Sequence, residues 1–168
     1  MTGDVQSDLR HPAILATALV TVCLWAAAAG RMLRARAGDW QAGSRPLRAW
    51  WLAGWVMLLV HIAAAFHVAH GWSHAVAYEH TERTAGVGEG LYVNYLFALV
   101  WGADAIWFGV NPRSYTHRPW WVGWAVHGFL SFVTFNATVV YGTGLAQWLG
   151  AFWFALLGWY WVRRARSS

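Results

Sequence analysis

Apolar residues gather in five runs along the chain, and polar or charged residues separate each run from the next. A helix needs about 20 residues, at a rise of 1.5 Å each, to cross the hydrocarbon core of a bilayer. Each run approaches that length, so the pattern predicts an all-α, polytopic membrane bundle with five transmembrane helices. The predicted spans are residues 13–30, 50–70, 91–110, 120–141 and 145–162.

The segments between the runs set the domain organisation. Residues 1–12 are polar and predict a short leader, and residues 13–168 predict a single membrane domain. The second run loosens at Gly71, and we expect its helix to continue out of the membrane to about Glu82. A cleaved signal peptide is the alternative interpretation of the first run. Its acidic leader and the arginines that follow it favour a retained helix.

Charge alternates from one side of the predicted membrane to the other. The loops after the first and third runs and the C-terminal tail are rich in arginine, whereas the leader and the loop after the second run are acidic. Arginine-rich segments remain in the cytoplasm under the positive-inside rule. The sequence therefore predicts a multi-pass protein of the cell inner membrane, with its N-terminus outside and its C-terminus in the cytoplasm.

The composition agrees with a membrane environment: 58% of the residues are apolar and 11% are charged. A net charge of +5 would indicate a nucleic-acid partner in a soluble protein. Here the arginines at the ends of the runs explain it, so we expect the lipid bilayer as partner and no nucleic acid. Many of the 15 tryptophans, Trp50 and Trp51 among them, fall at predicted membrane boundaries, where indole rings anchor helices.

Histidines concentrate at the outer end of the second predicted helix. Five of the eight lie within residues 61–80, and on one continuous helix His67, His70 and His74 would share a face. His70 with His74, or His67 with His70, could present two imidazoles to one copper, iron or zinc ion. Such a site needs further ligands from this chain or another. The candidates in this chain are Glu79, His80 and Glu82. The alternative is an interfacial helix whose histidines bind water, lipid headgroups or neighbouring loops.

A b-type haem is a second cofactor prediction. Haem in a helix bundle is held by two neutral imidazoles on facing helices. His127 in the fourth span is the candidate partner of His61 in the second, since their predicted depths differ by about one turn. Cys23 is the only cysteine, so no Cys-x-x-Cys-His haem attachment and no disulfide within the chain can form.

Asp104 is the one acidic residue inside an apolar run. An unpaired carboxylate at the centre of a membrane helix costs about 3 kcal/mol on insertion scales, so we expect it to face the bundle interior and to pair. His127 is the nearest candidate by depth. Such a pair suits proton exchange or support of a ligating histidine. The alternative is a hydrogen-bonded Asp104 that fixes the register of the helices.

Polar residues recur every three or four positions along the fourth span, and so form one stripe. The stripe consists of His127, Ser131, Thr134, Thr138 and Tyr141. It could line a proton or ion route or face a cofactor. Alternatively, the hydroxyls bond back to carbonyls of their own helix and pack at a helix–helix contact.

Three functions follow from these patterns. The first is a small membrane protein that binds a metal ion or haem in redox or metal handling. The second is a structural or assembly subunit that associates with other membrane proteins or with a second copy of itself. The third is a proton- or ion-conducting element. Motifs of serine hydrolases, phosphate loops and dinucleotide binding do not occur in the sequence, and whether the protein is an enzyme stays open.

Overall fold

The computed structural model describes residues 11–34 and 44–166, which form helices and no strands. Residues 1–10 of the predicted leader and most of the first arginine-rich loop lie outside the described part of the chain. In chain order the elements are α2 (Pro12–Arg34), α3 (Ser44–Val68), α4 (His74–Ala85), α5 (Gly90–Val110), α6 (Pro112–Thr116), α7 (Trp120–Phe135), the π-helical turn η1 (Asn136–Val140) and α8 (Leu145–Arg166).

Four helical segments are long and apolar enough to cross a membrane: Pro12–Met32, Arg45–Val68, Gly90–Val110 and Trp120–Val140. The all-helical prediction is therefore confirmed, and so are four segments suited to crossing. The fifth predicted span coincides with α8, which is 22 residues long but is not one of the four. Its apolar residues include several tryptophans, whose indole N–H makes them less hydropathic than aliphatic residues, and arginines end it.

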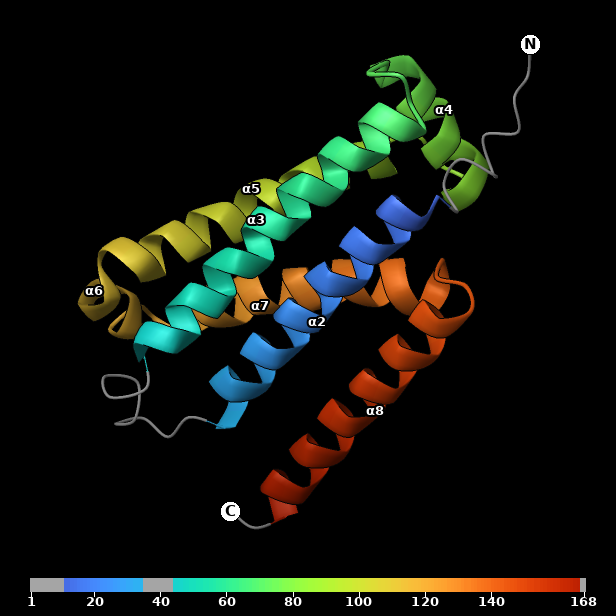
Figure 1. Ribbon diagram of the computed structural model, residues 1–168. Coiled ribbons are helices and arrows are strands. Elements are labelled where there is room, and N and C mark those ends of the chain that lie inside the picture. Colours follow the sequence, from blue (N-terminus) through green and yellow to red (C-terminus); the bar gives the residue numbers. More distant parts are fainter. Residues whose placement is uncertain (1–10, 35–43, 167–168) are drawn as a thin grey trace.

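The long helices alternate in direction and pack in sequence order (Figure 1). α2 packs along α3, α3 packs along α5, and α5 contacts α7. α8 packs on η1 and, over a smaller area, on α2. One end of the bundle consequently holds α6, the start of α3 and the end of α8, and the other end holds α4 and the turn between η1 and α8.

Aromatic side chains fill the contact between α3 and α5. Trp51 and Trp101 are fully buried, with ring centroids 5.1 Å apart. Glycines make room for these large rings: a Cβ at Gly54 would lie 2.8 Å from Trp101, and one at Gly102 would lie 2.7 Å from the Trp55 indole. Close packing of this kind is the main force between helices in lipid, because lipid tails are as apolar as the side chains.

The expected continuation of the second span to Glu82 does not form. α3 ends at Val68, and Gly71 and Trp72 take positive φ angles of 54° and 60°. The Ser73 hydroxyl then accepts a hydrogen bond from the Val76 N–H at 3.4 Å, which starts α4 as a separate helix. A left-handed pair of residues breaks the 3.6-residue period, so the histidines on its two sides do not share one helical face.

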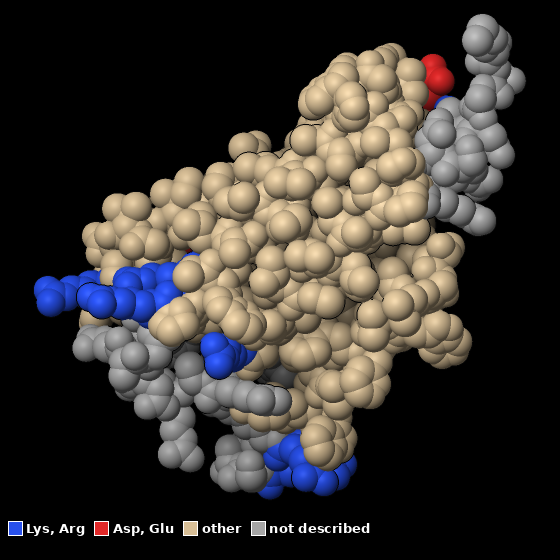
Figure 2. Space-filling model, in the orientation of Figure 1, with Lys and Arg blue, Asp and Glu red and all other residues tan. Residues whose placement is uncertain are grey.

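Charged side chains separate toward opposite ends of the molecule. Figure 2 shows arginines gathered at the end where α3 begins and α8 ends, and acidic residues near α4. The arginine-rich end includes Arg31, Arg45, Arg113 and Arg163, and the end with α4 includes Glu79, Glu82 and Glu89.

Candidate functional site

Asp104 is the centre of a buried hydrogen-bonded cluster at the arginine-rich end of the bundle. The residue is 4% exposed, and its carboxylate accepts three hydrogen bonds. The Trp51 indole N–H and the Tyr115 hydroxyl each donate to Oδ2 at 2.9 Å, and Arg118 donates to Oδ1 at 2.8 Å. The donors come from α3, from α6 and from the turn that precedes α7. One side chain of α5 thus joins three other segments.

Arg118 links Asp104 to His127. Its second guanidinium nitrogen lies 3.0 Å from His127 Nε2, and its carbon lies 3.7 Å from the centre of the Tyr115 ring. Arginine can only donate hydrogen bonds, so His127 Nε2 must accept and its proton must be on Nδ1. His127 is therefore neutral when this contact is made. Arg118 bonds to both partners and stacks on an aromatic ring, which lysine could not reproduce.

Asp104 and His127 do not form the direct pair that the sequence predicted. Arg118 lies between them and contacts both side chains. Both predicted residues do belong to one cluster. Sequence reasoning assigned Arg118 only to the charge of a loop. The available signal was its position next to Pro119, at the start of a span and within reach of an acid in the preceding span.

Trp51 and Tyr115 were not predicted as members of this cluster. Trp51 is fully buried rather than a lipid-facing anchor, and its ring packs on His127 at a centroid distance of 5.6 Å. Tyr115 stacks on Phe108 at 4.3 Å. Burial raises the pKa of the Tyr115 phenol far above its ordinary value, and the charge of Asp104 adds to this effect. The phenol therefore stays protonated and keeps donating to the carboxylate.

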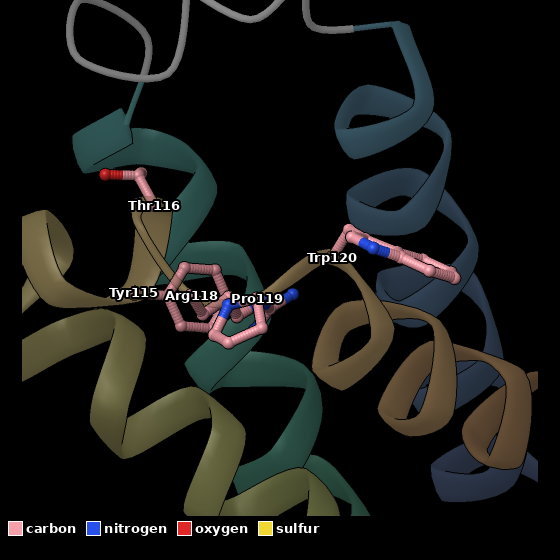
Figure 3. Close-up of a pocket in the computed structure, with 5 residues that line it drawn as sticks. All are labelled: Tyr115, Thr116, Arg118, Pro119 and Trp120. Atoms are coloured by element: carbon pink, nitrogen blue, oxygen red, sulfur yellow. The ribbon is translucent and has the colours of Figure 1, made fainter.

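A small open pocket adjoins the cluster (Figure 3). It measures about 170 Å³ and is lined by Tyr115, Thr116, Arg118, Pro119 and Trp120. The pocket can hydrate the outer side of Arg118, but it is too small for a haem.

His61 and His127, the predicted haem ligands, lie against different neighbours. His61 Nδ1 lies 3.2 Å from the hydroxyl of Thr17 on α2. His127 packs on Trp51, which is ten residues before His61 on α3 and so about 15 Å away along the helix axis. Two imidazoles on one metal ion place their nitrogens about 4 Å apart, since each metal–nitrogen bond is about 2 Å. The structure does not bring this pair together.

The polar stripe of the fourth span makes the contacts that the packing interpretation predicts. The Thr134 hydroxyl donates to the Leu130 carbonyl at 2.8 Å, and the Thr138 hydroxyl donates to the Thr134 carbonyl at 2.7 Å. Both threonines are buried, whereas Ser131 is half-buried and Tyr141 is exposed. The π-helical turn η1 contains Thr138, and Tyr141, the last residue of the predicted stripe, lies exposed just after it.

At the opposite end of the bundle, the turn between α3 and α4 separates His74 from His67 and His70. His67 is exposed, and its ring lies 6.4 Å from that of Trp72. His74 is exposed and packs near Tyr92 and Tyr95, with ring centroids 5.9 and 5.8 Å away. In the described part of the chain the ring contacts of His70 are with Phe66 and His80.

His70 instead lies beside His80, at a ring-centroid distance of 5.7 Å. His70 Nδ1 is buried and has no hydrogen-bond partner among the described residues. His80 Nε2 lies 3.2 Å from the Thr84 hydroxyl. Of the other predicted metal ligands, Glu79 is exposed and pairs with Arg83 at 3.9 Å. Within the described residues no group of three or more His, Cys, Asp or Glu side chains is placed to share a metal ion.

Burial keeps both imidazoles of this pair in the neutral form. It lowers the pKa of His70 below its ordinary value, and the neighbouring His80 lowers it further. The pKa of His80 is also lowered by burial and, to a smaller extent, by the positive charge of Arg83. Neutral imidazole is the form that a metal ion requires of a histidine ligand.

Protein-family models, curated proteins and solved structures were each compared with the chain, and none matches it.

The His70–His80 pair should make the packing of α4 on the rest of the bundle sensitive to acid. Because the folded pKa values lie below the ordinary value of about 6.5, the stability from the neutral pair is complete above pH 6.5 and declines as the pH falls through the lowered values. We expect the amide hydrogens of α4 to exchange faster at pH 5 than at pH 7, after correction for intrinsic rates. The His70→Gln/His80→Gln variant should lose this difference, and an unchanged difference would contradict the assignment.

Proposed function

We propose that this protein crosses the inner membrane five times and binds a transition-metal ion at its outer end, in metal handling or redox chemistry. The alternating directions of the long helices support this topology, because arginines gather at one end of the bundle. α8, with 22 residues, is long enough to supply the fifth crossing. The same charge asymmetry supports an N-terminus outside and a C-terminus in the cytoplasm.

The approach of His70 to His80 is the observation that carries the metal proposal. A metal ion lies about 2 Å from a ligating nitrogen and so about 3.1 Å from the centre of that ring. Two imidazoles on one ion therefore have centroids about 5 to 6 Å apart, depending on the angle at the metal. The observed 5.7 Å lies within this range. The buried Nδ1 of His70 has no hydrogen-bond partner among the described residues, and with the proton on Nε2 it has a free lone pair for a metal ion.

The Asp104 cluster supports this site from the opposite end. Trp51 belongs to α3, whose far end comes two residues before His70, and Asp104 belongs to α5, whose far end packs against α4. The hydrogen bond between them fixes the rotation and register of the two helices. A site shared between the end of α3 and α4 depends on that register, because misplacing a ligand by about 1 Å weakens metal coordination.

Elemental analysis of the purified protein tests the proposal. The full chain is stripped with chelator in detergent, equilibrated separately with copper, zinc or iron, and freed of unbound ion. We expect about one ion per chain, lost in the His70→Ala/His80→Ala variant. The matched control, His67→Ala/His74→Ala, removes the two exposed histidines of the same region and should keep the ion. Absence of bound ion in the unaltered protein, or binding that survives loss of His70 and His80, would overturn the proposal.

A further inference from the structure

We infer that the His70–His80 pair selects a soft monovalent cation, Cu(I), over divalent zinc, which deepens the proposed function and rests on it. The first reason is charge. The two ligands are neutral, the nearest charged side chain that acts on His80 is the cation of Arg83, and the acid Glu79 is already paired with that arginine. A half-buried site without a carboxylate compensates one positive charge more readily than two.

The second reason is coordination number. Zinc is almost always held by four ligands in structural sites and by three protein ligands in catalytic ones. Cu(I) is satisfied by two nitrogen ligands in a wide-angle, nearly linear arrangement. A tetrahedral angle would place the ring centroids about 5 Å apart and a linear one about 6 Å, given metal–nitrogen bonds of about 2 Å. The observed 5.7 Å lies between the two values and corresponds to an angle of about 130° at the metal, wider than tetrahedral.

The third reason is the way each ring is held. The Thr84 hydroxyl lies 3.2 Å from His80 Nε2, so this nitrogen can donate its proton to Thr84 and leave the Nδ1 lone pair for the metal. Ligating histidines commonly fix their tautomer through such a partner. His70 offers Nδ1, and its ring makes a T-shaped contact with Phe66 at a centroid distance of 5.4 Å. The structure assigns Nδ1 of both histidines as the ligands, with Thr84 as a positioning residue.

Competitive titration tests this selectivity. The full chain carries Cys23→Ser throughout, because a thiol would bind soft cations itself. Cu(I) is presented against a chromophoric Cu(I) chelator under reducing conditions, Ag(I) serves as a redox-inert analogue, and Zn(II) is titrated against a zinc indicator. We expect Cu(I) and Ag(I) to bind at least about 100-fold more tightly than Zn(II), with X-ray absorption showing two nitrogen neighbours. Thr84→Val, which retains both ligands, should weaken Cu(I) binding about tenfold.

The outcomes separate this inference from the proposed function. Zinc binding that equals or exceeds Cu(I) binding and depends on His70 and His80 would overturn the selectivity and leave the metal site standing. Binding of no ion would overturn both. Cu(I) affinity unchanged in His70→Ala/His80→Ala, in protein whose circular dichroism shows intact helices, would place the copper elsewhere and overturn the site. An unchanged affinity in Thr84→Val would overturn the assignment of His80 Nδ1 as the ligand.

Discussion

Replacing Asp104 with asparagine should lower the free energy of unfolding by about 3–5 kcal/mol, the usual cost of removing one partner from a buried ion pair. Arg118 would keep its charge beside α5 without the carboxylate that accepts from it at 2.8 Å. The arginine and aspartate side chains are 10% and 2% exposed, so the ion pair is largely shielded from solvent. Trp51 and Tyr115 would also donate to a weaker, neutral acceptor.

Equilibrium unfolding in mixed detergent micelles, followed by circular dichroism, measures this effect. Glu82→Gln is the matched control, because it removes one negative charge from an exposed position. The double variant Asp104→Asn/Arg118→Gln should be more stable than Asp104→Asn alone, since it leaves no uncompensated charge. Equal stabilities for Asp104→Asn and the unaltered protein would show that the cluster does not hold the bundle together.

Replacing Gly150 with leucine should detach α8 from η1. A Cβ at this position would lie 2.5 Å from Thr138 Oγ1 and 2.7 Å from Thr138 Cβ. Thr138 cannot turn away freely, because its hydroxyl donates to the Thr134 carbonyl at 2.7 Å. Overpacking of this kind costs about 1–3 kcal/mol. The contacts of Phe154 with Trp25 and Phe135 hold the middle of α8 and should loosen with it.

Gly158→Leu is the control. Gly158 lies about two turns after Gly150 on the same helix, and a Cβ there would have no described atom of a neighbouring helix within 4 Å. Gly158→Leu should be neutral or slightly stabilising, because the helix propensity of leucine is more favourable than that of glycine by about 1 kcal/mol. Limited proteolysis of the turn between η1 and α8 distinguishes the two variants. Gly150→Leu should be cut faster, and equal rates would contradict a specific contact between Gly150 and Thr138.

The helices could be predicted because lipid imposes a simple rule on sequence. A helix that crosses a membrane must be apolar over a fixed length. The apolar run over residues 91–110 has that length, and Pro112 marks the end of its helix. The break between α3 and α4 could not be predicted in the same way. Gly71 signalled only a weak point, whereas the left-handed conformation of Trp72 has no signature in the residue itself.

For a related reason, only some residues of the Asp104 cluster and of the His70–His80 pair could be predicted from the sequence. Depth in the membrane follows from counting residues, so Asp104 was correctly expected to be buried, and it shares a cluster with His127. Counting does not fix how each helix is rotated or how far a long side chain reaches. Arg118 enters the cluster from a turn, and His80 meets His70 only because the chain reverses between them.

The link between Asp104 and Arg118 also bears on how the chain enters the membrane. The two residues are 14 positions apart and are joined across the short helix α6. Their pairing can form as soon as α5, α6 and α7 have left the ribosome, without help from other helices. The cost of carrying a carboxylate into lipid, about 3 kcal/mol, is then offset within one hairpin. We expect α5 and α7 to insert together as a unit rather than one after the other.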